Sequence, residues 1–235
     1  MPDGSPDTSF NHTGRASFFS GFSAPFSKAM DVQSDGKIVL AGHTLFDDPA
    51  PFVAARFNSD GSIDSSFGSS GLGYGIYDWD TGDINKCADM LSLPDDKLIV
   101  GGRVANKSTP NARYNFAVIR IDSNGNADSS FGKNARLFTS PNGLKERNAG
   151  INKLLYQPDN KVIALGDSWN MEFPATTATL VRYATDGKTS ISELPRNKSE
   201  PISVYPNPAQ NMLYISNTSQ QKIESIGIFS LIGSS

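Results

Sequence analysis

The sequence has little of what disulfide bonding, metal binding or nucleophilic catalysis requires. Cys87 is the only cysteine, so no internal disulfide can form. Its position inside a predicted strand favours a small buried hydrophobe over a reactive thiol. His12 and His43 are the only histidines, and neither has the spacing of a metal site or of a nucleophile and its base. We therefore expect no metal, no cofactor and no catalytic residue.

Long apolar runs and basic runs are absent too. No stretch is long enough for a transmembrane segment, and no apolar segment of a signal peptide follows Met1. The net charge is −3 with both signs interspersed, so nucleic acid and anionic membranes are poor partners. With 37% hydrophobic residues, the chain can nevertheless bury a core.

What the sequence does contain is one block of ten residues that occurs three times, at 33–42, 93–102 and 157–166. Two flanking segments recur in step. One is an Asp-x-Ser-Phe segment, and the other is an apolar segment that ends in arginine. The first occurs at 7–11, 64–68 and 128–132, and the second at 52–56, 116–120 and 179–182. A fixed period indicates a solenoid, a propeller or an array.

Each copy predicts four short strands. The first strands are 15–19, 72–77 and 135–139, the second are 27–33, 87–93 and 151–157, the third are 37–41, 97–101 and 161–165, and the fourth are 52–57, 116–121 and 179–183. The aliphatic third strands should be buried on both faces, whereas the arginine-containing fourth strands should be outermost. We predict an all-β fold of three four-stranded antiparallel propeller-like blades. Closed propellers use four to eight blades, so we expect an open arc or partial propeller, or closure only with missing or partner blades.

The connecting turns carry residues that tolerate positive φ. Gly36, Asp96 and Asn160 occupy one position of the hairpin between the second and third strands, which predicts tight hairpins there. The turns at 58–64 and 122–128 have the composition of calcium loops, but an arginine stands where the first carboxylate should be. We therefore interpret them as capped turns.

The recurring arginines Arg56, Arg120 and Arg182 have two interpretations. A structural bridge to a turn aspartate is favoured, because a guanidinium matches a carboxylate in geometry. Anion binding is the alternative.

The motifs D-G-x-x-D-S-S-F-G, D-G-K-I-V-x-A-G and F-x-x-x-R resemble the delta-60 repeat family over residues 3 to about 187. That resemblance implies a β-propeller of extracellular bacterial proteins. The third copy departs from the pattern, because Asp186-Gly187 is followed by Lys188-Thr189-Ser190-Ile191. We therefore expect the array to end there, with domain 1–187 followed by a linker at 188–201.

Residues 202–235 resemble the C-terminal sorting domain of type IX secretion, through the segments V-Y-P-N-P-A, L-Y-I-S-N and I-x-I-F-S-L-I-G. The resemblance implies an incomplete Ig-like β-sandwich, because only the first half of the family's domain is present. It also implies the type IX secretion machinery as a partner and a secreted or cell-surface location. Export then requires a signal that lies upstream of Met1 or was removed.

The loops after the first and third predicted strands diverge between copies and emerge on one face, so they are free to carry recognition. Candidate ligand-binding residues there are Asp78, Trp79, Asp80, Asp83 and Trp169. Aromatic rings beside carboxylates suit sugar stacking, or a weak Ca²⁺ site. Rings tucked under the loops as core are the structural alternative.

We predict a secreted or cell-surface binding or scaffold protein that is not an enzyme, with a glycan or another protein as partner. One alternative is a secreted carbohydrate-active enzyme that uses Asp78, Asp80 or Asp83 as acid or base. A purely structural spacer is another.

Overall fold

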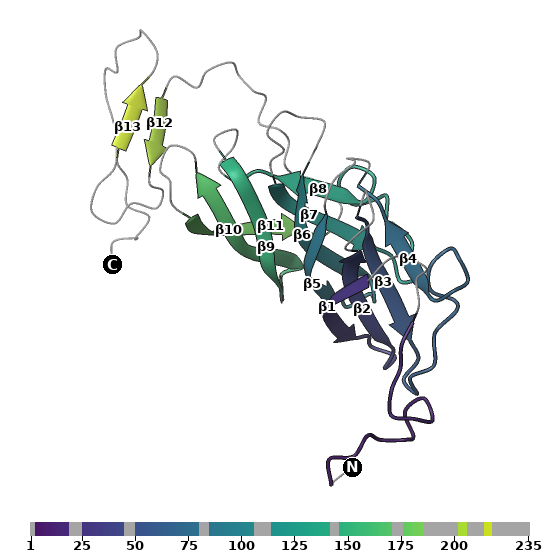
Figure 1. Cartoon of the computed structure of the whole chain (residues 1–235). Helices are drawn as coiled ribbons and strands as arrows, with labels where there is room; N and C mark the ends of the chain where they lie inside the picture. Colours follow the sequence, from purple (N-terminus) through teal and green to yellow (C-terminus); the bar gives the residue numbers. More distant parts are fainter. Residues whose placement is uncertain are drawn as a thin grey trace, which may run out of the picture. The chain divides into compact units, whose positions relative to one another are not determined.

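The computed structural model describes residues 3–18, 25–44, 50–79, 85–105, 114–141, 146–170, 176–185, 202–205 and 214–217. The regular secondary structure of these residues consists of β-strands (Figure 1). The chain divides into two compact units, Met1–Thr189 and Ser190–Ser235. The predicted all-β fold is confirmed.

The first unit contains three blades in chain order. Blade 1 comprises β1 (Pro25–Val32), β2 (Ile38–Thr44), β3 (Phe52–Phe57) and β4 (Tyr74–Tyr77). Blade 2 comprises β5 (Lys86–Ser92), β6 (Leu98–Ala105), β7 (Tyr114–Ile121) and β8 (Arg136–Thr139). Blade 3 comprises β9 (Glu146–Gln157), β10 (Lys161–Asn170) and β11 (Thr176–Ala184). In the second unit, β12 (Ile202–Tyr205) pairs antiparallel with β13 (Tyr214–Asn217).

The blades are shifted against the sequence repeat. The strand β4 follows the second Asp-x-Ser-Phe segment, yet it pairs with β3, and β8 likewise pairs with β7. The predicted first strand of each copy therefore completes the preceding blade. The interpretation of 52–57 as an outermost strand is wrong, because β3 is buried along its whole length between β2 and β4.

The same shift explains two further differences. Blade 3 has three strands among the described residues, with β11 at its edge. Residues 15–18 form no strand, although 15–19 was predicted as one. Among the described residues, no strand pairs with 15–18, and a strand needs such a partner for its backbone hydrogen bonds. Pairing within each blade is antiparallel as predicted, while one parallel pair, Tyr114 with Asn148, joins β7 to β9.

Strict alternation in blade 2 builds the core in two layers. Leu98 and Val100 of β6 pack in the layer shared with blade 1, whereas Ile99 packs in the layer shared with blade 3. Ile119 and Val118 of β7 divide in the same way. Successive strand residues point to opposite faces, so a continuous aliphatic run is what a blade between two blades requires. Cys87 is buried in the first layer as a small hydrophobe, as predicted.

Blades 1 and 3 each leave apolar side chains in solvent. Met30 of β1 is 69% exposed, and Leu155 and Leu180 of blade 3 are 63% and 67% exposed. The counterpart of Met30 in blade 2, Met90, is only 5% exposed. The faces at the two ends of the array thus expose apolar side chains of the kind that blade 2 buries.

The hairpin turns have the predicted left-handed residues. Gly36, Asp96 and Asn160 have φ of 82°, 58° and 59°. Gly61 and Gly125, in the turns after β3 and β7, both have φ of 84°. The hydrogen bonds of Gly36 to Gln33 and of Gln33 to Lys37 show a three-residue turn with a bulge. All five turns thus close through one residue with positive φ.

The second and third Asp-x-Ser-Phe segments are held by the arginine of the strand before them. Arg56 Nε donates to Asp64 Oδ2 at 2.7 Å, and Lys37 Nζ lies 3.1 Å from the same oxygen. The Arg56 guanidinium also lies 4.8 Å from the ring centroid of Phe67, which is fully buried. Arg120, Asp128 and Phe131 repeat this arrangement at 2.9 Å and 4.9 Å. The bridge interpretation is confirmed for both arginines, and we call this arrangement the arginine clasp.

Each clasp also reaches into the next blade. An Nη of Arg56 donates to the carbonyl of Ser123 at 2.6 Å, and an Nη of Arg120 donates to the carbonyl of Thr185. The backbone N–H of Gly68 donates to the carbonyl of Asn124 at 2.7 Å. One buried guanidinium therefore fixes its own blade and positions the following one.

The clasp also sets the ionisation of its carboxylates. Burial opposes the charge on Asp64 and is the largest single influence on it. Hydrogen bonds from Ser66 and Lys37 and the charge of Arg56 outweigh that influence, so the pKa of Asp64 lies below its usual range. The pKa of Asp128 is lowered for the same kinds of reason. Both groups are carboxylates wherever the protein is folded at neutral pH.

Two glycines with the same backbone conformation should respond differently to alanine. A Cβ on Gly36 would meet only Ser59, at 3.7 Å, whereas a Cβ on Gly125 would lie 2.5 Å from the backbone nitrogen of Gly68. We expect Gly36→Ala to cost about 1 kcal/mol through φ alone, and Gly125→Ala to cost about 2 kcal/mol more. Urea unfolding of both variants measures this. Equal costs would contradict the close docking of Gly125 under the second Asp-x-Ser-Phe segment.

Lysine in place of the clasp arginine should reveal the geometry of the interaction. Arg56→Lys keeps the charge but loses the planar fork that reaches both Asp64 and Ser123. We expect the free energy of unfolding to fall by about 2–3 kcal/mol. Lys133→Arg is the control, because it exchanges the same two residue types at an exposed position. A similar loss in both variants, measured by thermal melts, would count against the clasp.

Candidate functional site

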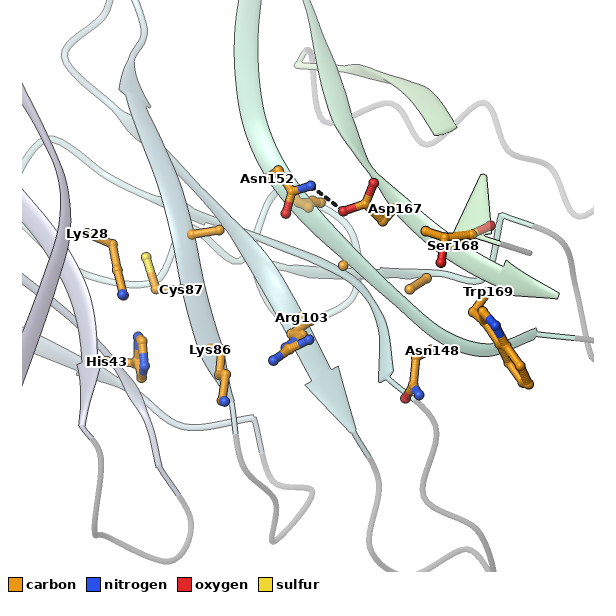
Figure 2. Close-up of a pocket in the computed structure, with 15 residues that line it drawn as sticks. Lys28, His43, Lys86, Cys87, Arg103, Asn148, Asn152, Asp167, Ser168 and Trp169 are labelled. Atoms are coloured by element: carbon orange, nitrogen blue, oxygen red, sulfur yellow. Dashed lines mark hydrogen bonds between the residues drawn. The ribbon is translucent and has the colours of Figure 1, made fainter. Parts of the chain in front are cut away.

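A pocket of about 630 Å³ opens across the inner strands of all three blades (Figure 2). It lies at the ends of the strands that lead into the divergent loops. Its lining comes from β1, β2, β5, β6, β9, β10 and β11. Cavities of this size hold small molecules or a few sugar rings. This is the face on which divergence between copies predicted recognition.

The blade 1 and blade 2 side of the pocket is cationic. Lys28 comes from β1, Lys86 from β5 and Arg103 from β6, and Lys86 and Arg103 are cross-strand partners. Arg103 also lies over the ring of Tyr114, at 4.8 Å from its centroid. Three cations in one pocket of a chain with net charge −3 mark a local concentration of positive charge.

The pKa of His43 reflects the positive charge of these three side chains. The side chain is 4% exposed, and burial followed by the charges of Lys28, Lys86 and Arg103 lowers its pKa from 6.5 to about 4. His43 is therefore neutral at pH 7.

The blade 3 side of the pocket is polar and carries one aromatic ring. Asn152 Nδ2 donates to Asp167 Oδ2 at 2.6 Å, and Asn148, Ser168 and Trp169 complete the wall. Figure 2 shows Trp169 beside Asn148, at the far end of the pocket from Lys28 and His43. Trp169 is half-buried. The wall thus combines amide and hydroxyl groups with an indole, a set that suits a hydroxylated ring.

Trp79 is buried, whereas a role in ligand binding requires an exposed ring. The indole is 2% exposed and packs edge-on between Phe52 of blade 1 and Phe138 of blade 2, with centroid distances of 5.2 Å and 5.1 Å. The Arg136 guanidinium lies 5.8 Å from its centroid. The structural alternative, an aromatic side chain serving as core, holds for this residue. Its ring faces are taken by other side chains and cannot stack on a sugar.

The other candidate residues differ in whether they line the pocket. Trp169 lines the pocket, as the candidate role requires. Asp78 is half-buried outside the pocket, where it accepts from the backbone N–H of Trp79 at 2.6 Å and its carbonyl accepts from Arg136. Asp80 and Asp83 lie outside the described residues. Of the described candidates, only Trp169 lines the pocket, and the ligand-binding role of the set stays a prediction.

The cations Lys28, Lys86 and Arg103 were not among the residues predicted from the sequence. They are far apart in the sequence and form no basic run. All three lie near the ends of predicted strands beside divergent loops. Placing those ends on one face of the array would have gathered them.

Two kinds of feature are absent from the residues that the structure describes. They contain no group of three or more His, Cys, Asp or Glu side chains placed to hold a metal ion. They also contain no helix long and apolar enough to cross a bilayer. Asp60 and Asp122 instead accept from amides of their own turns, at 2.8 Å from Ser62 and 2.9 Å from Asn124, as capped turns do.

The two tryptophans should separate in their effect on stability. Trp79→Ala removes a ring that joins two blades and should cost about 3–5 kcal/mol. Trp169→Ala should cost less than about 1 kcal/mol, because that ring is half-exposed. Chemical unfolding followed by circular dichroism gives both values. A Trp79→Ala variant whose free energy of unfolding is unchanged would mean that this indole does not belong to the core.

Comparison with protein families agrees with this architecture. Residues 33–67 and 93–131 match a β-propeller domain of unknown function (DUF5122), and residues 203–235 match the secretion system C-terminal sorting domain. No curated protein matches the chain. Both resemblances stated from the sequence are thereby confirmed. The chain combines β-propeller repeats with a type IX secretion sorting domain, and the protein is therefore a secreted or cell-surface protein.

Proposed function

We propose that this protein is a non-catalytic binding module for an acidic glycan, which it holds in the pocket across the three blades. The observation that carries the proposal is the composition of the pocket wall: three cations on one side, and Trp169 with amide and hydroxyl groups on the other. Carboxylate or sulfate groups suit the cations. Sugar hydroxyls suit the amides, and a sugar ring suits the indole.

The export signal supports an extracellular ligand. A protein with a secretion sorting domain meets polysaccharides outside the cell, many of which carry acid groups. Positive charge gathered in a pocket raises the local concentration of such a polyanion and speeds its association. The negative charge elsewhere on the chain limits binding outside the pocket.

The enzyme alternative is less well supported. Glycoside hydrolysis generally uses two carboxyl groups that flank the scissile bond. Among the described residues, the pocket lining contains one carboxylate, Asp167, which accepts a hydrogen bond from Asn152. We therefore favour binding without turnover.

A tetrasaccharide of galacturonic acid and its fully methyl-esterified form provide a matched test. We expect the acid form to bind and the ester to bind about tenfold more weakly or not at all, because esterification removes the charge but keeps the rings. Arg103→Gln and Trp169→Ala should each weaken binding about tenfold by calorimetry. Lys133→Gln is the control, because Lys133 is exposed and outside the pocket.

The histidine provides a second readout. His43 is one of only two histidines, so its imidazole signal is easily followed by NMR. A bound polyanion offsets the charges of Lys28, Lys86 and Arg103. The pKa of His43 should therefore rise from about 4 on binding. Equal binding of acid and ester, an unmoved His43 signal, or release of shorter sugars would each contradict the proposal.

A further inference from the structure

The pocket across the three blades is charged asymmetrically. Its cations come from blades 1 and 2, and among the described lining residues one acidic side chain, Asp167 of β10, stands in the blade 3 wall. Asp167 is exposed there, as is Asn152 beside it. A pocket built only to attract negative charge gains nothing from this carboxylate, because it repels the same groups that the cations attract. The position of Asp167 therefore bears on which acidic ligand fits.

A row of neighbouring residues joins the cations to Asp167. Lys86 of β5 and Arg103 of β6 are cross-strand partners. A Cβ on Gly150 of β9 would lie 3.2 Å from Cδ and 3.4 Å from Cβ of Arg103, so the arginine stem lies directly over this glycine. Gly150 is in turn the cross-strand partner of Asp167. Positive charge thus gives way to negative charge across successive strands of the pocket wall (Figure 2).

The two kinds of charge lie close enough for one ligand to meet both. Neighbouring strands are about 5 Å apart, and Asp167 lies one strand beyond the glycine that Arg103 covers. This separation is within the screening length of about 8 Å at physiological salt, so a group bound beside Arg103 also experiences the charge of Asp167. A sugar held by Arg103 therefore places its linked neighbour near Asp167.

The blade 3 wall suits an uncharged sugar. A carboxylate accepts hydrogen bonds at about four positions and donates none, and the bond from Asn152 Nδ2 to Asp167 takes one of these positions and orients the group. Sugar hydroxyl or amide N–H groups can donate to the others, and a charged acceptor makes such bonds stronger. Trp169 lies two residues further along β10, on the same face of the strand, where its ring can meet the same sugar. A second carboxylate at this place can donate nothing and is repelled.

We propose that Asp167 selects acidic polysaccharides in which charged and uncharged sugars alternate. The inference rests on the proposed function, because it concerns the same pocket and the same class of ligand. The acid group of one sugar pairs with Lys86 and Arg103, and the donors of the next sugar bind Asp167. A polysaccharide with an acid group on every sugar meets the same cations but places its next acid group against Asp167. Specificity of this kind depends on a repulsive group as well as on attractive ones.

Three forms of the galacturonic acid tetrasaccharide test the proposal with one set of rings: fully acidic, fully methyl-esterified, and esterified on alternate sugars. With the whole chain, we expect the alternating form to bind about tenfold more tightly than the fully acidic form by calorimetry. Asp167→Asn keeps the shape and an acceptor but removes the repulsion. This variant should bind the fully acidic form about tenfold more tightly and the alternating form within about threefold of the unchanged protein, so that the preference disappears.

A matched control separates this effect from that of net charge. Asp159 is exposed in the turn between β9 and β10, outside the pocket, so Asp159→Asn removes the same charge from the same blade and should leave the preference unchanged. Fully acidic sugar that binds at least as tightly as the alternating form would overturn the proposal. So would an Asp167→Asn variant in which both affinities change by the same factor, as expected of a purely structural carboxylate. A fully acidic form that binds no better than the full ester would instead contradict the proposed function, and this inference with it.

Discussion

The buried guanidinium of the arginine clasp is the interaction on which the array depends. A charge removed from water is costly unless it is paired and fully hydrogen-bonded. Arg56 meets this requirement only when Asp64, Phe67 and the carbonyl of Ser123 are all in place. Those partners belong to a turn of its own blade and to a turn of the next. The hydrogen bonds of one arginine therefore fix the order and spacing of neighbouring blades. Apolar contacts alone would allow one blade to shift along the next.

Much of the fold followed from local chemistry. Aliphatic runs such as 98–100 and turn residues such as Gly36 and Asp96 determine strands and hairpins through contacts close in sequence. The assignment of β4 and β8 to their blades could not be predicted in this way. Their sequence pattern fits pairing with the preceding blade and with the following blade equally well. Alternation indicates which side chains share a face. It does not indicate what covers that face.

The different environments of the two tryptophans could not be predicted for the same reason. Both stand beside divergent loops, and nothing in the local sequence distinguishes Trp79, packed between Phe52 and Phe138, from Trp169 in the pocket wall. The pocket itself is a product of tertiary structure. Its cations come from different blades and meet only because the inner strands of successive blades lie side by side. A site assembled from residues of different blades leaves no motif in the chain.

The offset between sequence repeat and blade has a consequence for how such genes change length. A duplicated stretch of DNA that encodes one repeat contributes the last strand of one blade and the first three of the next. Gain or loss of a whole repeat therefore joins compatible partners at every internal junction, wherever in the array it occurs. The protein can lengthen or shorten by recombination while the clasp at each internal junction stays the same.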